Sequence, residues 1–113
     1  MQLPDKYADV LCDAIVTYGR EAQIDMCIEE CSELIKALLK YRRLPPEEWL
    51  SKKGLNALKS IQEEIADVQI MIWQMDLMYG YGFTGDQIDK KINRLRERIK
   101  AVVKPKEEES GHE

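Results

Sequence analysis

Apolar residues recur every three to four positions along most of this chain, which is the period of an α-helix. The recurrence predicts four helices: from Pro4 to about Gly19, over residues 21–41, over residues 55–79, and from Thr84 to about Val103. Leu44-Pro45-Pro46 ends the second of these, because proline lacks the backbone N–H that a helix interior requires. A short helical turn carrying Trp49 is expected before the third helix begins.

The sequence between and outside these helices predicts no β-strand. One Phe and few runs of Val, Ile or Thr argue against β-structure, so the sequence predicts an all-α fold. We expect a four-helix bundle-like domain over residues 1–103, because the connections are short. Residues 104–113 are charged and lack apolar side chains, which predicts a disordered tail. Thr84 and Gln87 have the spacing of a capping box, which predicts the start of the fourth helix.

The second and third predicted helices are apolar over a broad face. The main stripe of the second helix consists of Ile24, Cys27, Ile28, Cys31, Ile35 and Leu38, and that of the third consists of Leu58, Ile61, Ile65, Val68, Ile72 and Met75. Met26, Leu34 and Ala37 flank the first of these stripes, and Met71 and Met78 flank the second. One partner helix would cover less surface than this. We therefore expect a dimer or a higher oligomer to complete the bundle.

Composition narrows the class of protein. A length of 113 residues suits one domain, and a formal net charge of −4 argues against a nucleic-acid polymer as partner. No apolar stretch approaches the roughly 18 residues of a membrane span, and the N-terminus lacks a signal-peptide pattern. Cys12, Cys27 and Cys31 lie within the predicted helices at positions that are expected to be buried in the core. We expect them to be reduced thiols in a cytoplasmic protein.

Two acidic pairs interrupt the apolar pattern of the second and third predicted helices. The pairs are Glu30 with Glu33 and Glu64 with Asp67. Residues three apart project in similar directions from a helix, so each pair points one way. On a helical wheel all four lie among apolar residues or at the margin of the apolar face. The neighbouring Glu29 and Glu63 fall further towards the polar side, where water solvates them.

Carboxylates grouped at an apolar interface repel one another and lose hydration, so they need protonation, a basic partner or a bound cation. Lys36 and Lys40 fall on the other side of their helix, which leaves the four acids few basic partners. An all-oxygen ligand set favours hard cations, and Mg²⁺ or Mn²⁺ fits best. Because Mg²⁺ commonly takes phosphate oxygens as further ligands, the acids predict a phosphorylated substrate.

The fourth predicted helix has a basic, amide-bearing side. Lys90, Asn93 and Arg94 lie opposite its apolar residues, which include Ile92 and Leu95. Such side chains suit phosphates and a sugar or base, although they are also common on any exposed helix. These three are candidate substrate-binding residues.

The order of these motifs resembles that of the all-α nucleoside triphosphate pyrophosphohydrolases, in particular their MazG-like members. The matching residues are Gln23, Glu29-Glu30-Cys31-Ser32-Glu33-Leu34, Ala37, Glu63-Glu64-Ile65-Ala66-Asp67 and Asp89-Lys90-x-x-x-Arg94. They cover most of the chain. The segment around Trp49 and the acidic residues 107–109 depart from the family's fuller pattern, which leaves the preferred base open.

The resemblance implies Mg²⁺-dependent cleavage of an NTP or dNTP between its α and β phosphates, giving a monophosphate and pyrophosphate, as in housecleaning of the nucleotide pool. It implies that the four paired carboxylates hold the metal and that one of them, Glu33 or Glu64, orients the attacking water. Lys90 and Arg94 would hold the phosphates, and Asn93 would touch the sugar or base. It also implies a homodimer or a dimer of dimers.

Two alternatives stay open at this point. A phosphoribosyl-ATP pyrophosphohydrolase shares the four-carboxylate arrangement, although the N-terminal region here lacks the pattern of that enzyme. A non-catalytic helical interaction module on the same scaffold belongs to a different class. Retention of all four inner carboxylates argues against the module, because a scaffold without a ligand has no physical reason to keep like charges together.

Overall fold

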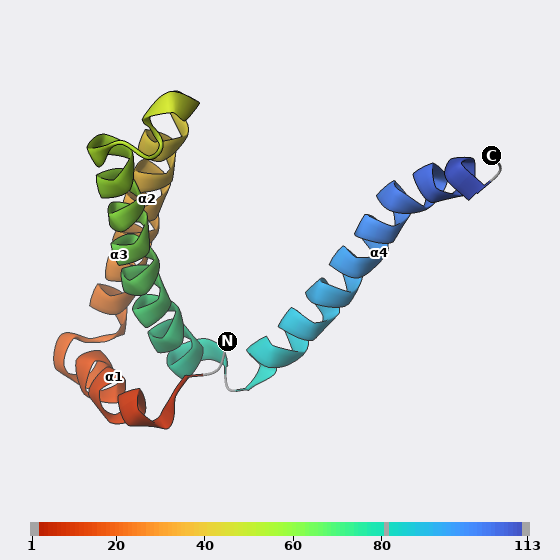
Figure 1. Cartoon of the computed structure of the whole chain (residues 1–113). Helices are drawn as coiled ribbons and strands as arrows, with labels where there is room; N and C mark the ends of the chain where they lie inside the picture. The colour runs from red at the N-terminus through yellow and green to blue at the C-terminus, as the bar shows by residue number, and fades with distance from the viewer. Residues whose placement is uncertain (1–2, 81, 112–113) are drawn as a thin grey trace. The chain divides into compact units, whose positions relative to one another are not determined.

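The computed structural model of the chain describes residues 3–80 and 82–111, with side chains for residues 3–80 and 82–103. Its elements in order are α1 (Asp5–Tyr18), α2 (Arg20–Arg42), η1 (Pro46–Glu48), α3 (Lys52–Met75), η2 (Asp76–Gly80) and α4 (Phe83–Gly111) (Figure 1). No strand occurs in these ranges, so the predicted all-α fold is confirmed. The chain divides into two compact units, Met1–Tyr79 and Gly80–Glu113.

Gly19 separates α1 from α2, as the sequence predicts. Its φ of 89° lies in the left-handed region, which glycine enters at little cost. The Gly19 N–H donates to the carbonyl of Ile15 at 2.9 Å and so closes the last turn of α1. One residue therefore ends one helix and starts the next.

The connection between α2 and α3 is held by aromatic packing and a helix cap. Trp49 follows the short 3₁₀ turn η1, stacks on Tyr41 with ring centroids 6.1 Å apart, and donates from Nε1 to the Leu44 carbonyl at 3.2 Å. Ser51 Oγ accepts the N–H of Gly54 at 3.2 Å, which caps α3. Because of this cap, α3 begins at Lys52 rather than at the predicted Leu55.

Gly54 has no room for a side chain. A Cβ built at this position would collide with the backbone carbonyls of Glu48 and Trp49. The glycine inside the first turn of α3 therefore lets the helix pass close to the η1 turn. Residues 76–79 are predicted to end one continuous helix, but together with Gly80 they form the π-helical turn η2, which buries Met78.

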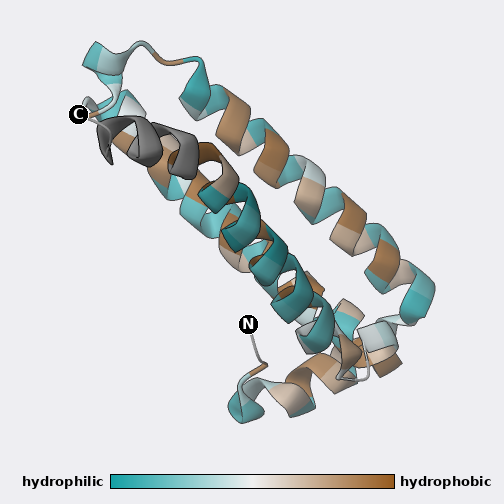
Figure 2. Cartoon of the chain, turned by 90° about the vertical axis from the view of Figure 1, so that its right-hand side faces the viewer, coloured by the Kyte–Doolittle hydropathy of each residue, from teal (hydrophilic) through white to brown (hydrophobic). Residues whose placement is uncertain are grey.

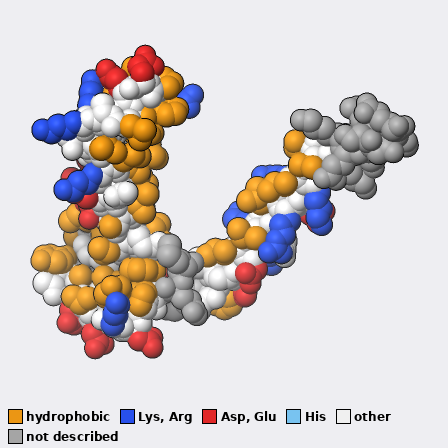
Figure 3. All heavy atoms as spheres, viewed as in Figure 1, with side chains coloured by type: hydrophobic (Ala, Val, Ile, Leu, Met, Phe, Trp, Pro, Cys, Tyr) orange, Lys and Arg blue, Asp and Glu red, His pale blue; other side chains and the backbone are white. Residues whose placement is uncertain are grey.

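The packing of α2 on α3 turns an unexpected face inward. Buried side chains on these two helices include Gln23, Ala57, Met71 and Gln74. Much of the predicted apolar stripe instead remains exposed, as at Ile28, Ile35, Leu38, Ile65 and Ile72. Apolar turns alternate with polar ones along these helices (Figure 2), and hydrophobic side chains cover much of the visible face of the first unit (Figure 3).

The cysteines are less buried than the sequence predicts. Cys12 is exposed on α1, because the α1 side chain that becomes buried is its neighbour Leu11. Cys27 and Cys31 are half-buried on α2. All three are free thiols, as expected.

The second unit contains α4. This helix begins at Phe83, so Thr84 lies inside its first turn rather than at the predicted cap, and Gly82 before it has a φ of 83°. The backbone is helical to Gly111 instead of ending near Val103, because the Lys and Glu residues after Pro105 favour helix intrinsically. The end of this helix therefore lies beyond the predicted Val103, and residues 112–113 lie outside the described residues. That residues 1–103 form one domain and that residues 104–113 form a disordered tail stay predictions.

None of the helices in the described ranges combines the length and the apolar character needed to cross a bilayer.

Candidate metal centre

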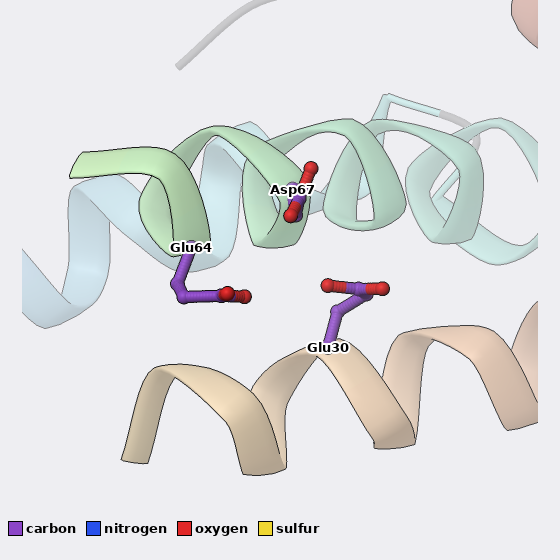
Figure 4. A group of neighbouring side chains, drawn as sticks. All are labelled: Glu30, Glu64 and Asp67. Atoms are coloured by element: carbon purple, nitrogen blue, oxygen red, sulfur yellow. The ribbon is translucent and has the colours of Figure 1, made fainter. Parts of the chain in front are cut away.

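Three of the four predicted ligands meet where α2 packs against α3. Glu30 projects from the middle of α2, and Glu64 and Asp67 project from successive turns of α3 (Figure 4). One carboxylate oxygen from each lies within 4.8 Å of the other two. The helical spacing of Glu64 and Asp67 directs both towards α2, and the pairing of the helices supplies Glu30 from the opposite side.

The three carboxylates differ in their contact with water. Glu30 and Glu64 are half-buried, whereas Asp67 is exposed. Burial raises the pKa of Glu30 above its ordinary value, and the charges of Asp67 and Glu64 raise it further. Burial likewise raises the pKa of Glu64, with the charges of Asp67 and Glu33 adding to the effect. The group is therefore under electrostatic stress when all its members are ionised.

No described basic side chain relieves this stress directly. Among the side chains of residues 3–80 and 82–103, the ion pairs are Lys36 with Glu33 and Lys100 with Glu97. Glu64 Oε2 is enclosed by protein and accepts no hydrogen bond from these residues. An enclosed carboxylate oxygen without a donor is unfavourable unless a cation or a proton reaches it.

Glu33 takes a different position from its three partners. It does not belong to the group of mutually close oxygens, and its side chain is 43% exposed. Lys36 Nζ donates to Glu33 Oε1 at 3.3 Å, although the sequence placed Lys36 on the other side of the helix. The (i, i+3) spacing and the long lysine side chain explain this contact. Glu33 nevertheless lies near enough for its charge to raise the pKa of both Glu30 and Glu64.

The donor set fits a hard divalent cation. Glu30, Glu64 and Asp67 offer only oxygen atoms and come from two helices, and one of their oxygens has no hydrogen-bond partner among the residues that the structure describes. Mg²⁺ and Mn²⁺ favour such ligands and keep further positions for water or phosphate oxygens. Glu29 and Glu63 are exposed, in agreement with their predicted solvation.

The remaining predicted site residues lie in the second unit. Lys90, Asn93 and Arg94 are exposed on α4, and Asn93 Oδ1 accepts from Arg96 Nη1 at 3.3 Å. Their assignment to the substrate stays a prediction.

An open pocket of about 390 Å³ adjoins the acidic group. Residues of α1, α2 and α3 line it, and Glu30 and Asp67 belong both to its wall and to the acidic group. The buried amides of Gln23 and Gln74 also line it. Gln23 entered the sequence analysis only as a motif residue, and Gln74 was missed. A glutamine within the apolar pattern of the third predicted helix is the signal that could have identified Gln74.

A comparison of the chain with protein-family models finds no match, and comparisons with curated proteins and with solved structures find none either. The resemblance to the pyrophosphohydrolases therefore depends on the motif residues alone.

Proposed function

We propose that this chain is a Mg²⁺-dependent nucleoside triphosphate pyrophosphohydrolase that acts on an NTP or dNTP in the cytoplasm. The observation that carries the proposal is the convergence of Glu30, Glu64 and Asp67 from two helices without a basic partner among the described side chains. The order of the acidic motifs, which resembles that of MazG-like enzymes, supports it as well.

Glu30, Glu64 and Asp67 would hold the metal, and Mn²⁺ could replace Mg²⁺ on the same oxygen ligands. Such an ion would polarise the phosphoryl group and lower the pKa of a bound water. Glu64 Oε2 would gain an electrostatic partner, which the described side chains do not supply. Metal binding and relief of carboxylate repulsion would thus be the same event.

The chain's own residues would divide the remaining work. Glu33 stands outside the three-oxygen group and keeps contact with solvent, so we assign it to orient the attacking water and accept its proton. The water oxygen bonds to phosphorus and the anhydride between the α and β phosphates breaks, which yields a nucleoside monophosphate and pyrophosphate. Lys90 and Arg94 would steady the phosphates, and Asn93 would contact the sugar or base.

The exposed apolar surface supports a homodimer or a dimer of dimers. Ile28 on α2 is 63% exposed and Ile65 on α3 is 52% exposed, although both belong to the main apolar stripes. In the second unit taken by itself, the apolar side chains described on α4 are exposed as well. Burial of the α2 and α3 stripes against a second copy would remove the large apolar area that these stripes leave in water within the first unit.

The proposal is tested by pyrophosphate release from a panel of NTPs, dNTPs and phosphoribosyl-ATP, with Mg²⁺ or with EDTA. We expect release with Mg²⁺ only, and its loss in Glu64→Gln and Asp67→Asn. Glu63→Gln removes an exposed carboxylate beside Glu64 and serves as the matched control, which should keep activity. Orthophosphate as the product, or full activity in Glu64→Gln, would contradict the proposal. Release from phosphoribosyl-ATP alone would favour the alternative enzyme.

A further inference from the structure

We propose that the pocket beside the acidic group holds the base of the nucleotide, and that the amide pair of Gln23 and Gln74 binds the hydrogen-bonding edge of that base. This inference rests on the proposed function for the class of ligand. It assigns the specificity-determining role to two residues of the first unit rather than to Asn93 of the second.

The position of the pocket follows from its wall. Glu30 and Asp67 belong to its lining, so a ligand whose phosphates lay near these residues would have room for its other atoms in this pocket. Much of the rest of the wall is apolar, including Met26, Ile70 and Met71. A volume of about 390 Å³ lies within the range of small-molecule sites, which are mostly apolar with a few convergent polar groups.

The two glutamines supply those polar groups. Gln23 is 4% exposed and Gln74 is 3% exposed, and they are the buried polar side chains of the described residues. Gln23 Nε2 donates to Gln74 Oε1 from α2 to α3. Buried amides are retained at a cost that apolar residues of similar size would avoid, unless all their hydrogen-bonding groups find partners.

The mutual hydrogen bond leaves half of each amide for other partners. It uses one N–H of Gln23 and one lone pair of the Gln74 oxygen, so Gln23 Oε1, the second N–H of Gln23 and the N–H groups of Gln74 remain. The contact of Gln74 Nε2 with Met71 Sδ, at 3.8 Å, is weak because a thioether is a poor acceptor. The two residues line the same pocket, so the pair offers a ligand there the acceptor Gln23 Oε1 and the donor Gln74 Nε2.

Neighbouring donor and acceptor groups are the common feature of nucleobase edges. Uracil and thymine offer N3–H beside O4, cytosine offers N4–H beside N3, adenine offers N6–H beside N1, and guanine offers N1–H beside O6. If both glutamine amides rotate by half a turn, their mutual bond survives and the donor and acceptor exchange positions. The pair thus suits bases that carry an oxo or an amino group at the same ring position, such as those of dUTP and dCTP.

Binding is measured by titrating the full chain with dUMP and dCMP in EDTA, alongside KM for dUTP and dCTP with Mg²⁺. Gln74→Met leaves the Gln23 amide without its partner, and the double variant Gln23→Met with Gln74→Met removes both amides together. The double variant should fold, since no buried polar group is orphaned. Gln62→Met replaces an exposed amide of α3 and is the matched control.

We expect the double variant to raise KM for both triphosphates by about tenfold or more, as the loss of hydrogen bonds in a buried site predicts. Monophosphate binding in EDTA should weaken in parallel, while the Mg²⁺-induced thermal shift of the free chain stays unchanged. Unaltered KM and unaltered monophosphate binding would overturn the base pocket and leave the proposed function in place. Monophosphate binding that needs the glutamines, without pyrophosphate release from any substrate, would overturn the proposed function and leave the pocket. If the chain neither binds nor hydrolyses any of these nucleotides, both the base pocket and the proposed function are overturned.

Discussion

A carboxylate oxygen of Glu30 on α2 and one of Glu64 on α3 lie within 4.8 Å of each other, and the Glu64 charge raises the pKa of Glu30. Burial raises the pKa of both residues as well. Two half-buried carboxylates at this distance oppose folding whenever both are ionised. Repulsion between these two carboxylates therefore lowers the stability of the metal-free chain.

Replacement of Glu64 by Gln should therefore stabilise the metal-free chain at neutral pH. The change removes one negative charge from the group and keeps the shape of the side chain. In EDTA, the melting temperature of Glu64→Gln should exceed that of the wild type by a few degrees, while millimolar Mg²⁺ should raise only the wild-type value. Glu63→Gln should respond to Mg²⁺ as the wild type does. A lower melting temperature for Glu64→Gln in EDTA would contradict this account.

The difference in stability between the wild type and Glu64→Gln should become smaller as the pH falls. The folded chain raises the pKa of Glu64, so near that pKa the folded state binds more protons than the unfolded state and stability falls as pH rises. Acidification towards the ordinary glutamate pKa of about 4.3 protonates Glu64 and removes the disadvantage of the wild type. The advantage of Glu64→Gln should shrink as pH falls. The charges of Asp67, Glu33 and Glu63 also raise the pKa of Glu64, so the wild type and Glu64→Gln are measured side by side at each pH.

Gly54 and Gly85 should respond in opposite ways to alanine. In an ordinary helix interior, replacing Gly by Ala stabilises by about 1 kcal/mol. At Gly54 the new Cβ would meet the carbonyls of Glu48 and Trp49, so Gly54→Ala should lower the free energy of unfolding. At Gly85 nothing lies within 4 Å of the new Cβ, so Gly85→Ala should not lower it. Urea unfolding measures the free energy of unfolding of the two variants. Equal changes in Gly54→Ala and Gly85→Ala would contradict the close approach of η1 to α3.

The exposed stripes of α2 and α3 should join two copies of the chain. Light scattering on the purified wild type should give at least twice the mass of 13.2 kDa. Ile35→Glu and Ile65→Glu each place a charge in a stripe and should shift the population towards monomer, because burying an isoleucine is worth about 1.5–3 kcal/mol. Leu50→Glu, at a side chain 85% exposed outside the stripes, is the control. A monomeric wild type would contradict the predicted oligomer.

The helices themselves could be predicted because their signals are local. Gly19, the Pro45-Pro46 pair and the apolar period mark most helix ends to within a few residues. The misplaced ends have local causes as well. The start of α3 depends on the hydrogen bond between Ser51 and Gly54, and the backbone of α4 continues through Lys and Glu residues that the sequence analysis assigned to a tail.

Glu30 and Glu33 share one side of a helix, as do Glu64 and Asp67, and the local sequence is enough to predict this because a 3.6-residue period sets their directions. Which of the four carboxylates meet depends on how the helices pack. The pairing of α2 with α3 draws Glu30 towards Glu64 and Asp67 and leaves Glu33 with Lys36.

The same pairing buries Gln23 and Gln74 and leaves Ile28 and Ile65 exposed, against the expectation from hydrophobicity alone. The sequence of a helix can make more than one of its faces suitable for burial. The face that becomes buried depends on the shape and chemistry of the surface packed against it.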